Sequence, residues 1–161
     1  MDVIISNTTP IITFLVLGKL DLLKEMYEKI YIPIGVYEEI ENGIEKEFYT
    51  DLKNYDWIEI KEINNKFALQ QLENHLDKGE AQALILYEEL KADLLIIDEK
   101  LGRSYAQRQN CNYIGSFGVL LRAKELNLID KIKPLLILAQ QRGIFIGERL
   151  FHSIVEIAGE N

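Results

Sequence analysis

Short apolar segments alternate with longer segments of helical periodicity, and this alternation predicts an α/β domain. Val3–Ser6, Ile30–Ile32 and Tyr113–Ile114 are short runs rich in β-branched and aromatic residues, which is typical of strands. Trp57–Ile60 alternates apolar and polar positions and predicts another strand. Leu94–Ile97 is continuously apolar, as expected for a central strand that has parallel neighbours on both sides and is covered on both faces of the sheet.

Segments with helical periodicity lie between these strands. The clearest one begins after Gly79 and runs over Glu80–Leu90. Another is predicted to begin at Pro10, where a proline costs no hydrogen bond, with Thr8 or Thr9 as its cap. Further helices are predicted over residues 20–26, 33–43, 64–76, 100–109, 117–126, 130–141 and 148–157. The expected architecture is therefore a three-layer sandwich, a central and mostly parallel sheet flanked by helices.

Composition limits the classes of protein that fit. The 161 residues predict a single domain over 1–161 with a full hydrophobic core. The single cysteine, Cys111, cannot form an intramolecular disulfide and is expected to be a small buried hydrophobic residue. The sequence contains no apolar run of about 20 residues, so no membrane span is predicted. Residues 1–5 lack the pattern of a signal peptide. The expectation is a cytoplasmic protein with no membrane partner.

The net charge of −8 argues against nucleic-acid binding through a simple basic face. A nuclease whose carboxylates hold a divalent cation is the exception, because the bound ion reverses the local charge. The ends of the predicted strands are the places to look for such a site, since ligands of parallel α/β sheets bind beyond the carboxyl ends of strands. The polar residues that follow these strands, or that lie on helices next to them, are Asn7, Asp98, Glu99, Ser116, Glu39 and Glu80.

Each acid also has a structural interpretation. Glu80 in the first turn of its helix is favoured by the helix dipole. Asp98 and Glu99 could cap the following helix, and Glu39 could lie on a solvated helix face. Considered together, these oxygen-bearing side chains are of the type that Mg²⁺ or Mn²⁺ prefers.

Several short motifs follow one another in a fixed order that covers nearly the whole chain. They are Ser6-Asn7-Thr8-Thr9-Pro10, Gly18-Lys19-Leu20-Asp21, Tyr31-Ile32-Pro33 with Val36-Tyr37-Glu38-Glu39-Ile40, Lys78-Gly79-Glu80-Ala81, Ile97-Asp98-Glu99-Lys100 with Arg103, Gly115-Ser116-Phe117-Gly118 and Gly143-Ile144-Phe145-Ile146. In their order and spacing these motifs resemble a PIN domain, and more narrowly the branch related to VapC-type toxins that is catalogued as a domain of unknown function.

This resemblance implies a metal-dependent endoribonuclease that acts on single-stranded RNA. By position, the metal ligands fall on Asn7, Glu39, Glu80 and Asp98, with Glu99 beside the last. Glu39, Glu80 and Asp98 would be the catalytic acids, and the ion would be Mg²⁺ or Mn²⁺. The residues expected to contact the RNA are Thr8, Lys100, Arg103 and Ser116.

Asn7 departs from the family pattern, which has an aspartate after the first strand. Its amide oxygen can bind a cation but brings no charge, and the sequence leaves open whether the amide is native or an inactivating substitution. Two functions therefore stay open. One is an active nuclease, the toxin of a toxin–antitoxin pair; the other is a weakened PIN-like module that binds RNA or a partner protein. On the sequence alone, Asn7→Asp is expected to strengthen Mn²⁺ binding and to lower the stability of the metal-free protein.

The expected partners follow from the same interpretation. A toxin needs an antitoxin protein, and the negative net charge suits a basic partner. The apolar helices from Ile132 onward are expected to supply core residues and a surface for a homodimer.

Overall fold

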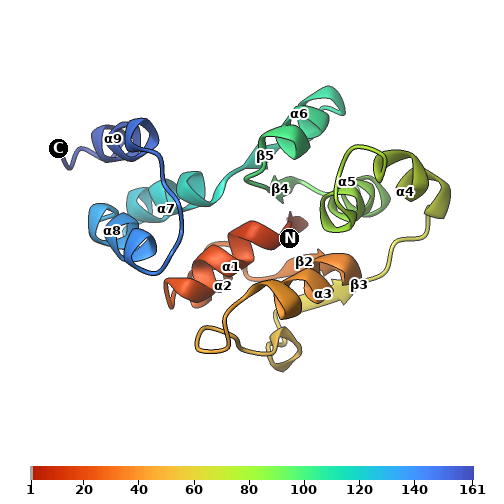
Figure 1. Ribbon diagram of the computed structural model, residues 1–161, viewed down its shortest axis with the longest axis horizontal. Coiled ribbons are helices and arrows are strands. Elements are labelled where there is room, and N and C mark those ends of the chain that lie inside the picture. The colour runs from red at the N-terminus through yellow and green to blue at the C-terminus, as the bar shows by residue number, and fades with distance from the viewer. Residues whose placement is uncertain (1) are drawn as a thin grey trace.

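A parallel five-stranded sheet lies at the centre of the protein, with helices on both of its faces (Figure 1). The computed structural model describes residues 2–161. Its elements, in chain order, are β1 (Ile4–Ser6), α1 (Thr8–Val16), α2 (Asp21–Tyr27), β2 (Ile30–Pro33), α3 (Ile34–Gly43), the 3-10 turn η1 (Leu52–Asn54), β3 (Ile58–Lys61), α4 (Lys66–Leu72), α5 (Lys78–Leu90), β4 (Leu94–Ile96), α6 (Lys100–Arg108), β5 (Tyr113–Ile114), α7 (Ser116–Glu125), α8 (Lys133–Gln141) and α9 (Glu148–Ile157).

The strand order is β3-β2-β1-β4-β5, and every neighbouring pair is parallel. The apolar strand β4 lies between β1 and β5, so the prediction that it has parallel neighbours on both sides is confirmed, although β1 holds the middle of the sheet. The register pairs Ser6 with Ile96 and Ile96 with Ile114. The carboxyl ends of these three strands consequently meet at one edge.

The sheet separates two hydrophobic cores, because successive strand residues face opposite sides. Ile4 and Ile96 belong to the larger core, which is formed with α1, α2, α3, α7, α8 and α9. Ile5, Leu95 and Ile97 belong to the smaller core, which is built mainly on α5 and includes Cys111. The three-layer arrangement and the buried cysteine are thus as predicted.

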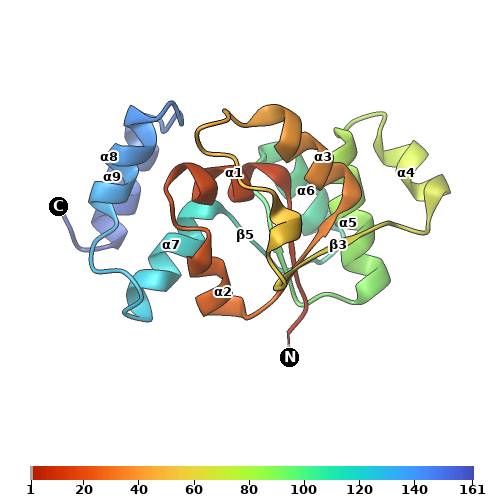
Figure 2. The ribbon, with the colours of Figure 1, turned by 90° about the horizontal axis from the view of Figure 1, so that it is seen from below.

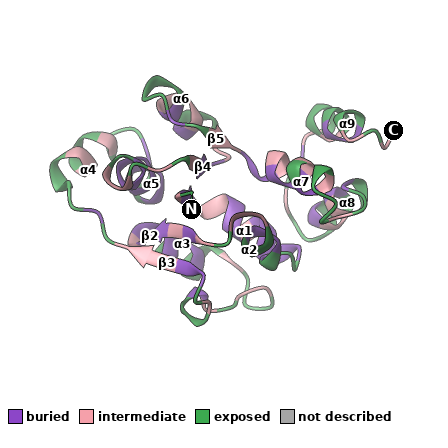
Figure 3. Ribbon diagram, turned by 180° about the vertical axis from the view of Figure 1, so that it is seen from behind, coloured by how far each residue is buried: buried purple, intermediate pink, exposed green. Residues whose placement is uncertain are grey.

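The helices at the two ends of the molecule differ in how far they are buried. The pair α8 and α9 lies at one end and α4 at the opposite end (Figures 1 and 2). Burial is concentrated around the sheet, and much of α4 and α9 is exposed (Figure 3). Helix α4 contains no buried residue, whereas α9 buries Ile154 and Val155. Within residues 2–161, no helix has the length and apolar character needed to cross a membrane.

Glu160 fastens the end of the chain to the rest of the fold. Its carboxylate accepts hydrogen bonds from Lys124 Nζ at 2.7 Å, Ile132 N at 2.8 Å and Lys133 N at 2.9 Å. Burial alone would raise its pKa, but these donors outweigh that effect and lower the pKa to about 2. The last turn of the protein is therefore held by an ionised and mostly buried carboxylate.

Three predicted helix boundaries are corrected by the structure. Helix α1 begins at Thr8 and not at Pro10, and Asn7 occupies the cap position without a side-chain cap bond, so neither Thr8 nor Thr9 is the cap. Helix α4 covers only Lys66–Leu72. It begins at Lys66 because Asn65 is its cap, whose side chain accepts from Ala68 N. Helix α8 begins at Lys133, where Pro134 occupies its first turn.

Candidate functional site

The sequence-predicted residues gather beyond the carboxyl ends of β1, β4 and β5, between the first turns of neighbouring helices. Asn7 follows β1, and its backbone N–H donates to Ile96 O at 2.9 Å, which fixes it beside the end of β4. Asp98 and Glu99 follow β4 after Ile97, and Ser116 begins α7 directly after β5. Helices α3 and α5 bring Glu39 and Glu80 to the same edge, the two helices being in extensive contact.

Asn7 is almost fully buried, with 1% of its surface exposed. Its Nδ2 donates to Glu99 Oε2 at 3.0 Å. Its Oδ1 accepts no hydrogen bond from any residue in the described part of the chain. Thr9 donates its hydroxyl hydrogen to Glu99 Oε1, so both oxygens of the Glu99 carboxylate are held by residues that follow β1.

Glu39 is held by the start of two different helices. Thr8 Oγ1 donates to Glu39 Oε1 at 2.6 Å, and Gly79 N donates to Glu39 Oε2 at 3.2 Å. A Cβ atom at residue 79 would overlap Glu39 Oε1. Glycine is therefore required for the close approach of α3 and α5, and the hydroxyl of Thr8 serves Glu39 instead of capping α1.

Glu80 occupies the first turn of α5 as part of a capping box. Asp77 Oδ1 accepts from Glu80 N at 2.8 Å, and Glu80 Oε1 accepts from Asp77 N at 3.3 Å. The other oxygen, Oε2, is buried and has no partner among residues 2–161. Burial, followed by the nearby carboxylates of Asp77 and Glu99, raises the pKa of Glu80 to about 7. The structural role expected for a first-turn acid is present, and it uses only one of the two oxygens.

Both carboxylate oxygens of Asp98 accept hydrogen bonds from Ser116. Ser116 N donates to Oδ1 at 2.7 Å and Ser116 Oγ donates to Oδ2 at 2.5 Å. Gly115 makes this possible, since a Cβ there would lie 2.9 Å from Asp98 Oδ1. The possible role of Asp98 and Glu99 as caps of α6 is not seen: the cap position is Glu99, without a side-chain cap bond.

The residues expected to contact RNA have different surroundings. Thr8 and Ser116 are bonded to Glu39 and Asp98, as described above. The guanidinium of Arg103 lies over the Tyr113 ring, with Cζ 5.3 Å from the ring centroid. Its buried Nε has no hydrogen-bond partner in the described chain. Lys100 is exposed at the start of α6. Two of the four predicted contacts are therefore already used inside the protein.

The donor chemistry of the edge fits a hard divalent cation in part. Within residues 2–161, two buried side-chain oxygens, Asn7 Oδ1 and Glu80 Oε2, have no hydrogen-bond partner, and Asn7 is hydrogen-bonded to the Glu99 carboxylate. An unpaired buried polar atom is costly, and a bound cation is one kind of partner that satisfies such an oxygen. The complete ligand set expected from the sequence is not assembled, however. Among residues 2–161, no three His, Cys, Asp or Glu side chains form a group ready to hold a metal ion.

Several residues of the site are missed by reasoning from the sequence. Asp77 was detectable, because Asp77-x-x-Glu80 is the spacing of a capping box. The sequence suggests Thr9 only as a cap, although it binds Glu99. Gly102 carries no sequence signal of its own, yet a Cβ there would lie 2.8 Å from Glu80 Oε2 and 2.6 Å from Ile97 Cδ1.

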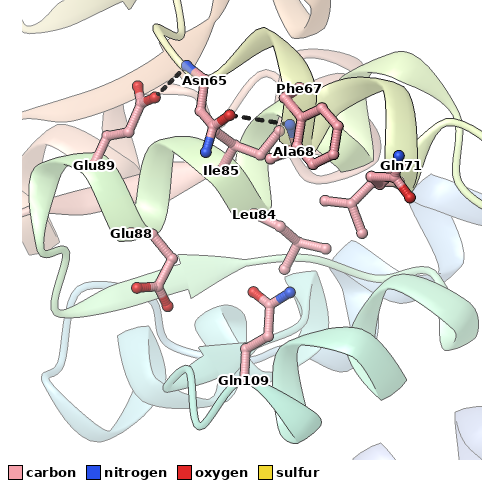
Figure 4. Close-up of a pocket in the computed structure, with 10 residues that line it drawn as sticks. Asn65, Phe67, Ala68, Gln71, Leu84, Ile85, Glu88, Glu89 and Gln109 are labelled. Carbon is pink, nitrogen blue, oxygen red and sulfur yellow. Dashed lines mark hydrogen bonds between the residues drawn. The ribbon is translucent and has the colours of Figure 1, made fainter.

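The apolar pocket shown in Figure 4, a surface hollow, is separate from this edge. It measures about 580 Å³ and is lined by residues of α4 and α5, including Phe67, Leu84 and Glu88, with Gln109 at its border. None of the sequence-predicted site residues lines it. A smaller hollow of about 300 Å³ does touch the edge, between Glu39 and Lys78.

Comparison with known proteins assigns the chain to a protein family. A parallel α/β sheet with acidic side chains gathered at one carboxyl edge is consistent with a nuclease domain, and the family model for the PIN domain matches residues 3–160. The chain belongs to the PIN-domain family. PIN domains are in general nucleases that act on RNA and use divalent metal ions. The search of curated proteins found no match, and neither did the search of solved structures.

Proposed function

We propose that this PIN domain is a Mg²⁺- or Mn²⁺-dependent endoribonuclease that cleaves single-stranded RNA, and that it is the toxin of a toxin–antitoxin pair. Membership of a nuclease family supports the reaction class. The observation that carries the metal dependence is that two side-chain oxygens of this edge, Asn7 Oδ1 and Glu80 Oε2, are buried without a partner in residues 2–161, and that Asn7 is bonded to the Glu99 carboxylate.

The residues that would hold the cation are Glu80, Asn7 and Glu99, with Glu39 and Asp98 adding negative charge around them. A bound divalent ion supplies charge stabilisation for a phosphodiester in its transition state and lowers the pKa of a water nucleophile. Thr8, Gly79 and Ser116 keep Glu39 and Asp98 in fixed orientations, so the site needs little rearrangement when charge develops. Lys100 and Arg103 are the cations proposed to contact the RNA backbone.

The function is tested by Mn²⁺ titration calorimetry and by cleavage of a fluorescent single-stranded RNA. We expect the wild type to bind Mn²⁺ and to cleave in its presence, with cleavage lost when a chelator is added. Glu80→Gln removes the carboxylate but keeps the size of the side chain, and should abolish both signals. Glu88→Gln is the matched control, since Glu88 is an exposed acid of the same helix and lines the other hollow. A wild type that gives no binding heat and no cleavage contradicts the proposal.

A binding module without catalysis is the second candidate. It is favoured by the state of Glu39 and Asp98, whose carboxylates are already satisfied by groups of the protein, and by the neutral side chain at residue 7. This alternative predicts that the RNA binds without being cut, and that EDTA does not weaken binding.

We also propose two protein partners, an antitoxin and a second copy of the chain. The net charge of −8 suits a basic antitoxin segment near the acidic edge. Exposed apolar side chains of the last helices and the loop between them, among them Phe145 at 91% and Ile157 at 70% exposure, support a homodimer.

A further inference from the structure

Asn7 and Glu99 form a hydrogen-bonded pair that joins the ends of β1 and β4. The amide nitrogen Nδ2 donates to Oε2 of the carboxylate at 3.0 Å, and the hydroxyl of Thr9 donates to the other oxygen. Glu99 is only partly buried, while Asn7 is almost fully buried. An amide and a carboxylate in contact carry one negative charge between them.

This bond determines which atom of the Asn7 amide is left without a partner. Because Nδ2 is engaged by Glu99, Oδ1 is left as the buried atom without a partner in the described chain. Glu80 Oε2 lies beside the first turn of α6, 2.8 Å from the place that a Cβ of Gly102 would take, and Glu99 is the cap residue of that helix. The bond therefore fixes the orientation of both the Asn7 amide and the Glu99 carboxylate.

We infer that Asn7 is a positioning residue: its amide holds the Glu99 carboxylate beside Glu80, so that the single negative charge of the pair is carried by residue 99 and not by residue 7. An aspartate at residue 7 would place two carboxylates in contact and would remove the donor between them. An amide at residue 99 would remove the charge altogether. Exchanging the two groups, Asn7→Asp together with Glu99→Gln, keeps one charge and one donor. The part of this inference that concerns a metal rests on the proposed function.

The exchange can be tested first on the metal-free protein, by thermal unfolding in the presence of a chelator. Asn7→Asp should lower the melting temperature by about 5 °C, because like charges then meet in a mostly buried place. The exchange variant Asn7→Asp/Glu99→Gln should recover most of that loss, since the amide introduced at residue 99 can donate to the new carboxylate. Recovery of the melting temperature in the exchange variant requires that residues 7 and 99 interact with each other. It is not expected if residue 7 only fills space.

The second measurement is Mn²⁺ affinity by calorimetry on the same proteins. Affinity should follow the number of carboxylates in the pair. Glu99→Gln should bind about 10-fold to 100-fold more weakly than the wild type. The exchange variant should return to within about 3-fold of the wild type, and Asn7→Asp should bind more tightly than either.

The two measurements test the pairing of Asn7 with Glu99 and the metal-dependent function separately. If the exchange variant melts as low as Asn7→Asp, or if both fail to fold, the pair is not coupled and the inference is wrong whatever the metal does. If Asn7→Asp fails to fold while the exchange variant folds, that rescue supports the inference. A wild type without Mn²⁺ heat overturns the metal-dependent function, and the stability measurement then decides the pairing by itself.

Discussion

At the scale of single residues, glycines make room for the acids of the site. Gly79, Gly102 and Gly115 each lie where a Cβ atom would collide with Glu39, Glu80 or Asp98. A side chain at one of these positions would push a carboxylate away from its present partners. The geometry of the acids thus depends on residues that have no functional group.

Gly102→Ala tests this dependence. The new Cβ would lie 2.6 Å from Ile97 Cδ1 and 2.8 Å from Glu80 Oε2, and such overpacking typically costs about 1–3 kcal/mol. We expect that loss in the free energy of urea unfolding, together with weaker Mn²⁺ binding. The control is Gly43→Ala, where the nearest atom outside α3 is 3.7 Å away and alanine favours the helix. Equal stability of the two variants would contradict the argument.

The pKa of Glu80 predicts how stability responds to pH. Its folded-state pKa of about 7 lies above its ordinary value of 4.5. Between these values the folded protein keeps a proton that the unfolded chain releases, so the metal-free protein should lose stability as the pH rises from about 4.5 to 7. Urea unfolding at several pH values in that window, in the presence of a chelator, measures the slope. Glu80→Gln should flatten it; an unchanged slope would assign the effect to other groups.

The location of the site residues could be predicted from the sequence, but their pairings could not. Asn7, Asp98 and Ser116 are identifiable because each follows a strand, and parallel strands end at one edge. The bonds of Asn7 to Glu99 and of Ser116 to Asp98 depend on side-chain rotamers and on room left by neighbouring glycines. No pattern along the chain reports either of these.

At the scale of elements, two helices of the same face differ in what holds them. Helix α5 buries nine of its residues and begins with a capping box, whereas α4 buries none and depends on the Asn65 cap and on the Glu89 carboxylate, which accepts from Asn64 N and Asn65 N. Strand and helix order followed from apolar periodicity. The end of α4 did not, because this helix is short and its core-facing residues, Ala68, Leu69 and Leu72, are only partly buried, so that packing does not fix its length.

Removing the caps of these helices should have unequal effects. Asp77→Ala deletes the cap of α5 and should cost about 1 kcal/mol of unfolding free energy. Asn65→Ala should cost less in global unfolding, because α4 can fray without exposing buried residues. Hydrogen exchange would place the Asn65→Ala effect in α4 alone. Equal losses of global stability would show that α4 unfolds only together with the core.

At the scale of the whole molecule, the carboxylate of Glu160 connects the end of the chain to α7 and α8. Its pKa of about 2 lies below its ordinary value of 4.5. The stability that it contributes is therefore fully present above about pH 4.5 and is lost as the pH falls toward 2. We expect Glu160→Gln to lower the unfolding free energy by about 1–2 kcal/mol at neutral pH and to reduce the acid sensitivity. A variant as sensitive to acid as the wild type would contradict this role.

The proposed dimer is also a property of the whole molecule. Phe145→Ser and Ile157→Ser should shift the mass measured by light scattering toward the monomer at micromolar concentration. Phe67→Ser is the matched control, because Phe67 is 71% exposed but lies in α4, at the opposite end. A wild type that is monomeric throughout the micromolar range would remove the homodimer from the proposal.

The central position of β1 has a consequence for synthesis of the protein. Its neighbour β2 follows soon after it, at Ile30–Pro33, but its other neighbour, β4, begins only at Leu94. Until that segment has been made, one edge of Ile4–Ser6 has no strand to pair with. A growing chain thus presents an open strand edge for more than half of its translation, and that edge is a natural binding place for a chaperone.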